Sequence, residues 1–124
     1  MTTSGWIGVD LDGTLARYDH WIGGKIGDPI PVMVNRVKEW VRLGIDVRIF
    51  TARVSLEGGY SLESKRSADQ EFAEEQTALI KEWCLEHIGV VLPVTYKKDF
   101  MMIELWDDRA IQVIPNTGMR ADGK

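Results

Sequence analysis

Residues 6–14, Trp-Ile-Gly-Val-Asp-Leu-Asp-Gly-Thr, join a short apolar run to two carboxylates that stand one residue apart. Such a run is typical of a buried parallel strand, so Asp10 and Asp12 are predicted to lie at the rim of a sheet. Two carboxylates this close repel each other unless a cation lies between them, and Mg²⁺ prefers such oxygen ligands. Gly13 allows a sharp backbone turn close to a ligand. The simpler alternative is an Asp-Gly turn with solvated carboxylates.

Polar residues also follow two later apolar runs, and two lysines precede the second of these runs. In chain order they are Thr51-Ala52-Arg53 after residues 45–50, Lys97-Lys98, and Asp107-Asp108 after residues 102–106. Ligands of open α/β sheets bind beyond the carboxyl ends of the strands. Residues far apart in the sequence are therefore expected to share one pocket.

This ordered set resembles the four-motif signature of the haloacid dehalogenase (HAD) superfamily of phosphotransferases. The matching features are a strand-terminal Asp-x-Asp-Gly-Thr, a strand-terminal Thr, a lysine and a strand-terminal Asp-Asp, and the resemblance covers residues 6–114. It implies a Mg²⁺-dependent phosphohydrolase. The segments between the motifs are filled by predicted helices and strands, so the chain looks like a small member without a cap domain.

The chemistry of phosphoryl transfer assigns roles to the first two acids. Asp10 is the expected nucleophile, because its carboxylate is ionised at neutral pH and can form an aspartyl phosphate without an activating base. Asp12 is the expected general acid and base, since it lies two residues away at the same rim. The HAD resemblance implies the same roles and a Mg²⁺ contact through the Asp12 backbone carbonyl. It also implies that Asp108 binds Mg²⁺ directly and that Asp107 acts through water or the lysine, so Asp10, Asp12, Asp107 and Asp108 form the predicted metal set.

The remaining site residues are predicted to contact the phosphate. Thr51 would offer its hydroxyl and Ala52 its backbone N–H, although a β-branched Thr is also ordinary strand material. Lys98 would neutralise the phosphate charge, with Lys97 as the alternative and two solvated lysines as the simpler view. The predicted substrate-binding set is completed by Leu11, Gly13, Thr14, Ala52 and Arg53, while Thr51 and Lys98 are counted with the catalytic residues.

Hydrophobic periodicity and the positions of glycine and proline predict alternating strands and helices. Strands are expected at residues 6–10, 45–50, 90–96, 102–106 and 111–114, and helices from Pro31 to Gly44 and from a Ser67–Gln70 capping box to Gly89. Residues 15–31 and 54–66 are expected to be loops. This order predicts one HAD-like domain over residues 1–124, a three-layer α/β/α sandwich with a Rossmann-like parallel sheet of about five strands, no cap domain and a flexible tail at 115–124.

Composition limits the classes of partner. The chain has 124 residues and a net charge of −4, which gives no basic face for general nucleic-acid binding. We expect a cytoplasmic protein, because no apolar run approaches the ~20 residues of a membrane span, the first residues lack a signal-peptide pattern, and Cys84 has no partner for a disulfide. Cys84 fits a small core residue better than a catalytic thiol. The chain has five tryptophans, which could form an exposed apolar patch for a partner, and a homo-oligomer is one such possibility.

The sequence leaves several alternatives open. The chain could be a non-catalytic module that binds Mg²⁺ and phosphate, or a phosphotransferase whose acceptor is not water. Its phosphorylated substrate could be a sugar phosphate, a nucleotide, a phosphoprotein or a nucleic-acid end. The site could be covered by residues 18–25, by residues 54–66 or by a second subunit. The aromatic residues Tyr18 and Trp21 could anchor the first of these loops or contact substrate.

Overall fold

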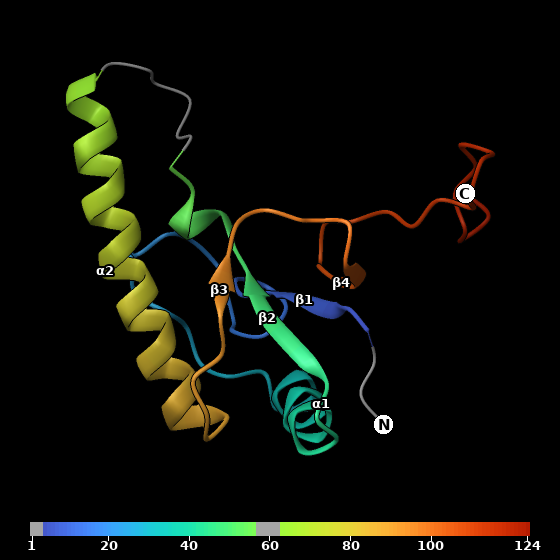
Figure 1. Cartoon of the computed structure of the whole chain (residues 1–124), viewed down its shortest axis with the longest axis horizontal. Helices are drawn as coiled ribbons and strands as arrows, with labels where there is room; N and C mark the ends of the chain where they lie inside the picture. The colour runs from blue at the N-terminus through green and yellow to red at the C-terminus, as the bar shows by residue number, and fades with distance from the viewer. Residues whose placement is uncertain (1–3, 57–62) are drawn as a thin grey trace.

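The protein is a small α/β fold built on a parallel sheet. The structure is a computed structural model that describes residues 4–56 and 63–124, with side chains from 4–56 and 69–124. The elements are β1 (Trp6–Asp10), α1 (Pro31–Arg42), β2 (Asp46–Phe50), the short 3₁₀ helix η1 (Ala52–Val54), α2 (Glu63–His87), β3 (Val94–Thr95) and β4 (Met102–Trp106). The four strands run parallel in the order β3-β2-β1-β4, as Figure 1 shows.

The first helix begins and ends where the sequence predicts. Pro31 occupies the first turn, where a missing N–H costs no hydrogen bond, and Met33, Val34 and Val37 form its buried stripe. Gly44 follows the helix with a φ of +78°, a conformation that glycine adopts without strain. Its N–H donates to the Val41 carbonyl at 3.0 Å, which closes the end of the helix before β2.

Both helices cover the same face of the sheet. Ile7 and Val9 of β1 pair in register with Val47 and Ile49 of β2, so these side chains point to one face. They form a single buried cluster with apolar residues of both helices, which include Met33, Val34 and Val37 of α1 and Ile80, Trp83, Cys84 and Ile88 of α2. The described residues thus form two layers, and within them the third layer of the predicted sandwich is not seen.

The sheet has four strands over the described residues rather than five. Residues 111–114 do not join it, because they make only a single bridge between Val113 and Arg120 within an exposed C-terminal segment that extends away from the sheet (Figure 1). The predicted strand at 90–96 is reduced to Val94–Thr95 at the edge. Pro93 explains this shortening, since proline has no N–H for the strand ladder.

The second helix is longer than the sequence predicts. It begins at Glu63 rather than at Ser67, because Glu, Lys and Arg at 63–66 are good helix formers that extend the helix by one turn. The rest of the predicted loop includes residues 57–62, which lie outside the described residues. None of the helices described here combines the length and apolar character needed to span a bilayer.

Candidate active site

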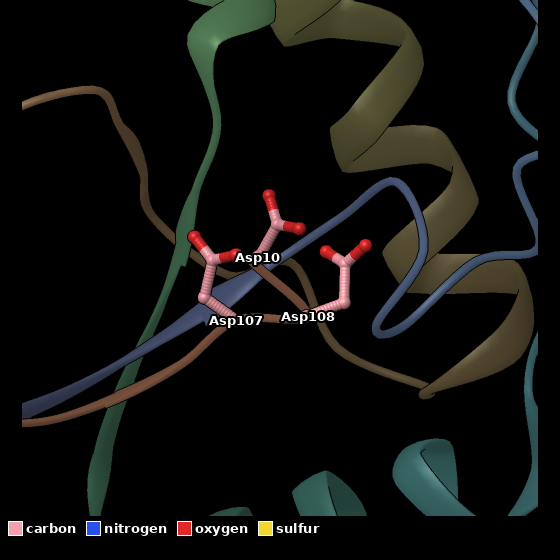
Figure 2. Close-up of side chains that lie close together, drawn as sticks. All are labelled: Asp10, Asp107 and Asp108. Atoms are coloured by element: carbon pink, nitrogen blue, oxygen red, sulfur yellow. The ribbon is translucent and has the colours of Figure 1, made fainter. Parts of the chain in front are cut away.

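Three aspartates meet at the carboxyl ends of neighbouring strands. Asp10 ends β1, and Asp107 and Asp108 directly follow β4, which pairs with β1. One carboxylate oxygen from each residue lies within 4.8 Å of the others, and Figure 2 shows the three side chains gathered above the strand ends. The predicted convergence of Asp10 and Asp108, which are almost a hundred residues apart, is therefore confirmed.

The turn after β1 brings the two strand ends together. Gly13 has a φ of +89°, and a Cβ atom placed there would lie 2.6 Å from an Asp108 carboxylate oxygen, so the turn needs glycine. The Thr14 hydroxyl accepts a hydrogen bond from the Asp108 N–H at 3.0 Å. It can donate to Asp10 Oδ2 at 3.4 Å or to Asp108 Oδ1 at 3.3 Å. Gly13 and Thr14 thus position the carboxylates.

The clustered charges destabilise the ionised form of Asp10. Burial, a hydrogen bond with Asp108 and the charges of Asp107, Asp108 and Asp12 together raise the pKa of Asp10 from 3.8 to about 7. Burial is the largest of these causes. A carboxylate held in this environment gains from a nearby cation, because the cation offsets both the lost hydration and the repulsion.

Asp12 is held by a buried arginine instead of joining the other aspartates. Arg53 Nε and Nη2 donate to the two Asp12 carboxylate oxygens at 2.7 and 2.8 Å. The guanidinium also donates to the carbonyls of Gly24 and Lys25 at 2.6 and 3.1 Å, and to Gln76 Oε1 at 2.8 Å. These bonds link the end of β1, the loop at residues 21–28 and helix α2.

Arg53 therefore positions Asp12 rather than a substrate. Its side chain is 4% exposed, and all five N–H donors of the guanidinium are engaged in the contacts above. No donor is left for a phosphate, although the sequence placed Arg53 in the substrate-binding set. The residue is delivered by η1, whose first turn is capped by the Thr51 hydroxyl accepting from the Arg53 N–H at 3.2 Å.

A cavity of about 450 Å³ opens beside these side chains. It is lined by Asp10, Asp12, Tyr18, Trp21, Phe50, Thr51, Ala52, Arg53, Phe72, Asp107 and Arg109. Thr51 is buried at the end of β2, and Ala52 is exposed beside it. The structure thus brings the predicted Thr51 and Ala52 to the same cavity as the carboxylates, and Arg109 adds a positive charge at its wall.

The two predicted lysines and Leu11 do not line the cavity. Lys98 is exposed and is not among the residues that line the cavity, and Lys97 lies with its Nζ 5.2 Å from the centre of the Tyr96 ring. The Leu11 side chain is fully buried in the core, so only its backbone remains for a ligand. The Leu11 carbonyl accepts from the N–H groups of Leu15 and Ala16, at 3.0 and 2.8 Å.

Sequence reasoning missed two aromatic residues of the cavity. Phe72 stands at helical spacing with the apolar residues Ile80 and Trp83, a pattern that predicts core packing. Its side chain is nevertheless 40% exposed and lines the cavity. Phe50 is ordinary strand material in the sequence, but it is the last residue of β2 and also lines the cavity. Helical or strand spacing cannot distinguish such positions, because a residue at the end of a core stripe can face either the core or a pocket.

Comparisons with known proteins support the fold and nothing finer. No family model and no curated protein sequence matches the chain. A solved structure of a conserved protein from Bacteroides thetaiotaomicron is similar, with 21% sequence identity and a TM-score of 0.56. The match covers 92% of this chain and 84% of the other chain. This likeness supports the small α/β fold alone, because one fold can carry many functions.

Proposed function

We propose that the protein is a Mg²⁺-dependent phosphohydrolase of the HAD type that acts through an aspartyl phosphate on Asp10. One observation carries the proposal: three carboxylates from two neighbouring strand ends lie within 4.8 Å of one another beside a cavity. A strand-terminal threonine, Thr51, lines the same cavity and offers a hydroxyl to a phosphate. The order of these residues along the chain is that of the HAD signature.

The donor set fits Mg²⁺. Asp10, Asp107 and Asp108 supply only carboxylate oxygens, the hard ligands that this ion prefers. Arg53, a buried arginine beside this cluster, donates its hydrogen bonds to Asp12, Gln76 and two backbone carbonyls instead. Burial first, and then the neighbouring carboxylates, raise the pKa of Asp10, so ionisation of this group is costly without a cation beside it. When bound, Mg²⁺ would keep these carboxylates ionised and neutralise charge on the phosphoryl oxygens.

The chain's own residues then perform two displacements. The Asp10 carboxylate attacks the phosphorus, the bond from phosphorus to the leaving oxygen breaks, and Asp12, which enters the cycle in its protonated form, gives that oxygen a proton. A water molecule next attacks the aspartyl phosphate, Asp12 takes its proton, and inorganic phosphate leaves with Asp10 restored. Arg53 orients the Asp12 side chain, and Thr51 binds a phosphoryl oxygen.

Hydrolysis of an aryl phosphate tests the proposal. We expect turnover with Mg²⁺, none with EDTA, and loss of turnover in Asp10→Asn. Asp46→Asn is the matched control, because Asp46 is an exposed aspartate at the opposite end of the same sheet. Equal activity of Asp10→Asn and the wild type would overturn the proposed nucleophile. A shift to phosphorylated products when alcohols compete with water would indicate a phosphotransferase.

A non-catalytic Mg²⁺ and phosphate binding module is the second candidate. It is favoured by Lys98, the predicted phosphate-neutralising residue, which is exposed and does not line the cavity. Titration calorimetry with Mg²⁺ separates the two candidates. Mg²⁺ binding that is weakened in Asp108→Asn, without turnover over a broad panel of phosphate esters, would favour the module.

A further inference from the structure

The cavity beside the carboxylates is unusually rich in aromatic side chains. Four of its eleven lining residues are aromatic, whereas aromatic residues make up 9% of the chain. We call these four, Tyr18, Trp21, Phe50 and Phe72, the aromatic subsite. They come from the loop after β1, the end of β2 and helix α2, so three separate segments contribute to one wall.

The aromatic rings remain accessible instead of packing into the core. Tyr18, Trp21 and Phe72 are 41%, 47% and 40% exposed, although all three line the cavity. More than half of each residue's surface is buried, and the remainder stays open. Their exposure leaves ring surface for a ligand.

Trp21 contacts two side chains in this exposed position. The guanidinium carbon of Arg53 lies 4.8 Å from the centre of the indole ring, and that guanidinium is itself fixed by its five hydrogen bonds. The Phe72 ring lies 6.0 Å away at an interplanar angle of 46°. A ring fixed before binding loses little conformational entropy when a ligand stacks on it.

We propose that the aromatic subsite binds a planar aromatic ring in the leaving group of a phosphate monoester, either a nucleobase or a phenyl ring. The inference rests on the proposed phosphohydrolase function and names its substrate class. A volume of about 450 Å³ lies in the usual range of small-molecule pockets, roughly 300–1,000 Å³, and exceeds the needs of a phosphate alone. Stacking on aromatic side chains is favourable for any planar π system.

Two matched pairs of esters test the inference. A nucleoside 5′-monophosphate and ribose 5-phosphate differ by the base, and benzyl phosphate and cyclohexylmethyl phosphate differ by the aromaticity of a ring of similar size. Both members of each pair have a primary alcohol as leaving group, so their intrinsic reactivities are close. We expect the ring-bearing member of at least one pair to have a kcat/KM roughly tenfold higher. The pair with the larger ratio of kcat/KM values shows whether the aromatic subsite prefers a nucleobase or a phenyl ring.

Substitutions test which residues cause the preference for ring-bearing esters. Trp21→Leu and Phe72→Leu should each reduce the ratio within a pair toward unity, while Phe100→Leu should preserve it. Phe100 is the matched control, because it is a fully exposed aromatic residue that does not line the cavity. Phe72→Leu still tests the aromatic subsite if Trp21→Leu misfolds. Phe72 lies on the surface of α2 and has no contact with Arg53 among the contacts described above.

The outcomes separate this inference from the proposed function. Turnover of all four esters with ratios near unity would overturn the aromatic subsite and leave the phosphohydrolase intact. Without any turnover, the phosphohydrolase proposal fails, and Mg²⁺-dependent binding of the same pairs by calorimetry decides the subsite. Equal affinity for the nucleoside monophosphate and ribose phosphate, and for the benzyl and cyclohexylmethyl esters, would then overturn it.

Discussion

Removing the guanidinium of Arg53 should destabilise the fold far more than removing a similar guanidinium at the surface. Arg53 is paired with Asp12, and their side chains are 4% and 19% exposed. Arg53→Ala leaves the Asp12 carboxylate, the Gln76 side chain and the Gly24 and Lys25 carbonyls without their donor. The variant therefore keeps a largely buried charge and loses the group that compensated it.

The expected magnitude follows from this burial. Breaking one partner of a buried ion pair costs roughly 3–5 kcal/mol, a large part of the ~5–15 kcal/mol that stabilises a typical domain. With a urea slope of roughly 2 kcal/mol/M, the unfolding midpoint should fall by about 1.5–2.5 M. Arg53→Lys should fall between the alanine variant and the wild type, because an ammonium cannot reproduce the fork of donors.

Arg48→Ala is the matched control. Arg48 also donates two hydrogen bonds to one carboxylate, that of Asp46, and its guanidinium carbon lies 4.7 Å from the centre of the Trp6 ring. Its ion pair is more open, with side chains 33% and 45% exposed, so its loss should cost less than about 1 kcal/mol. The two arginines thus share a forked carboxylate pair and an aromatic contact, and they differ in burial and in the three further hydrogen bonds of Arg53.

Urea unfolding followed by tryptophan fluorescence, with EDTA present, measures all three variants. The reasoning is refuted if Arg53→Ala unfolds within about 1 kcal/mol of Arg48→Ala, because burial would then contribute nothing to the cost. Under the proposed function, Arg53→Lys protein that remains folded at low temperature should show a lower kcat with a smaller rise in KM, since Arg53 acts on Asp12 and has no donor left for the substrate.

Three further outcomes follow from the site. Because the pKa of Asp10 is raised from 3.8 to about 7, the metal-free folded state holds a proton that the unfolded state has lost. The free energy of unfolding should therefore fall as pH rises from about 4 to 7, by ~1–2 kcal/mol after solvent screening. In EDTA, the urea midpoint of the wild type should be lower at pH 8 than at pH 5, whereas the midpoint of Asp10→Asn should not show this loss. An equal change of midpoint in both proteins would contradict the prediction. Gly13→Ala should weaken Mg²⁺ binding at least tenfold in calorimetry, because the added methyl group displaces Asp108 and the φ of +89° becomes strained; unchanged affinity would show that the turn adapts. Burial raises the pKa of Cys84 to about 11, so this thiol should react with a disulfide reagent at pH 8 only after urea is added, and rapid labelling of the native protein would exclude that burial.

The sequence by itself determined the secondary elements that carry the site. The bounds of β1 and the start of α1 follow from local causes, namely an apolar run that ends in Asp10 and a proline in the first turn of a helix. The convergence of Asp10 with Asp108 also followed, because parallel strands present their carboxyl ends at one edge.

Only the tertiary structure decided where the side chains at this edge point. It pairs Arg53 with Asp12, leaves Lys98 outside the cavity lining, and exposes Phe72 to the cavity rather than the core. It also places both helices on one face of a four-stranded sheet. Local sequence fixes which residues form an element, but the direction of a side chain depends on segments that pack against it from distant parts of the chain.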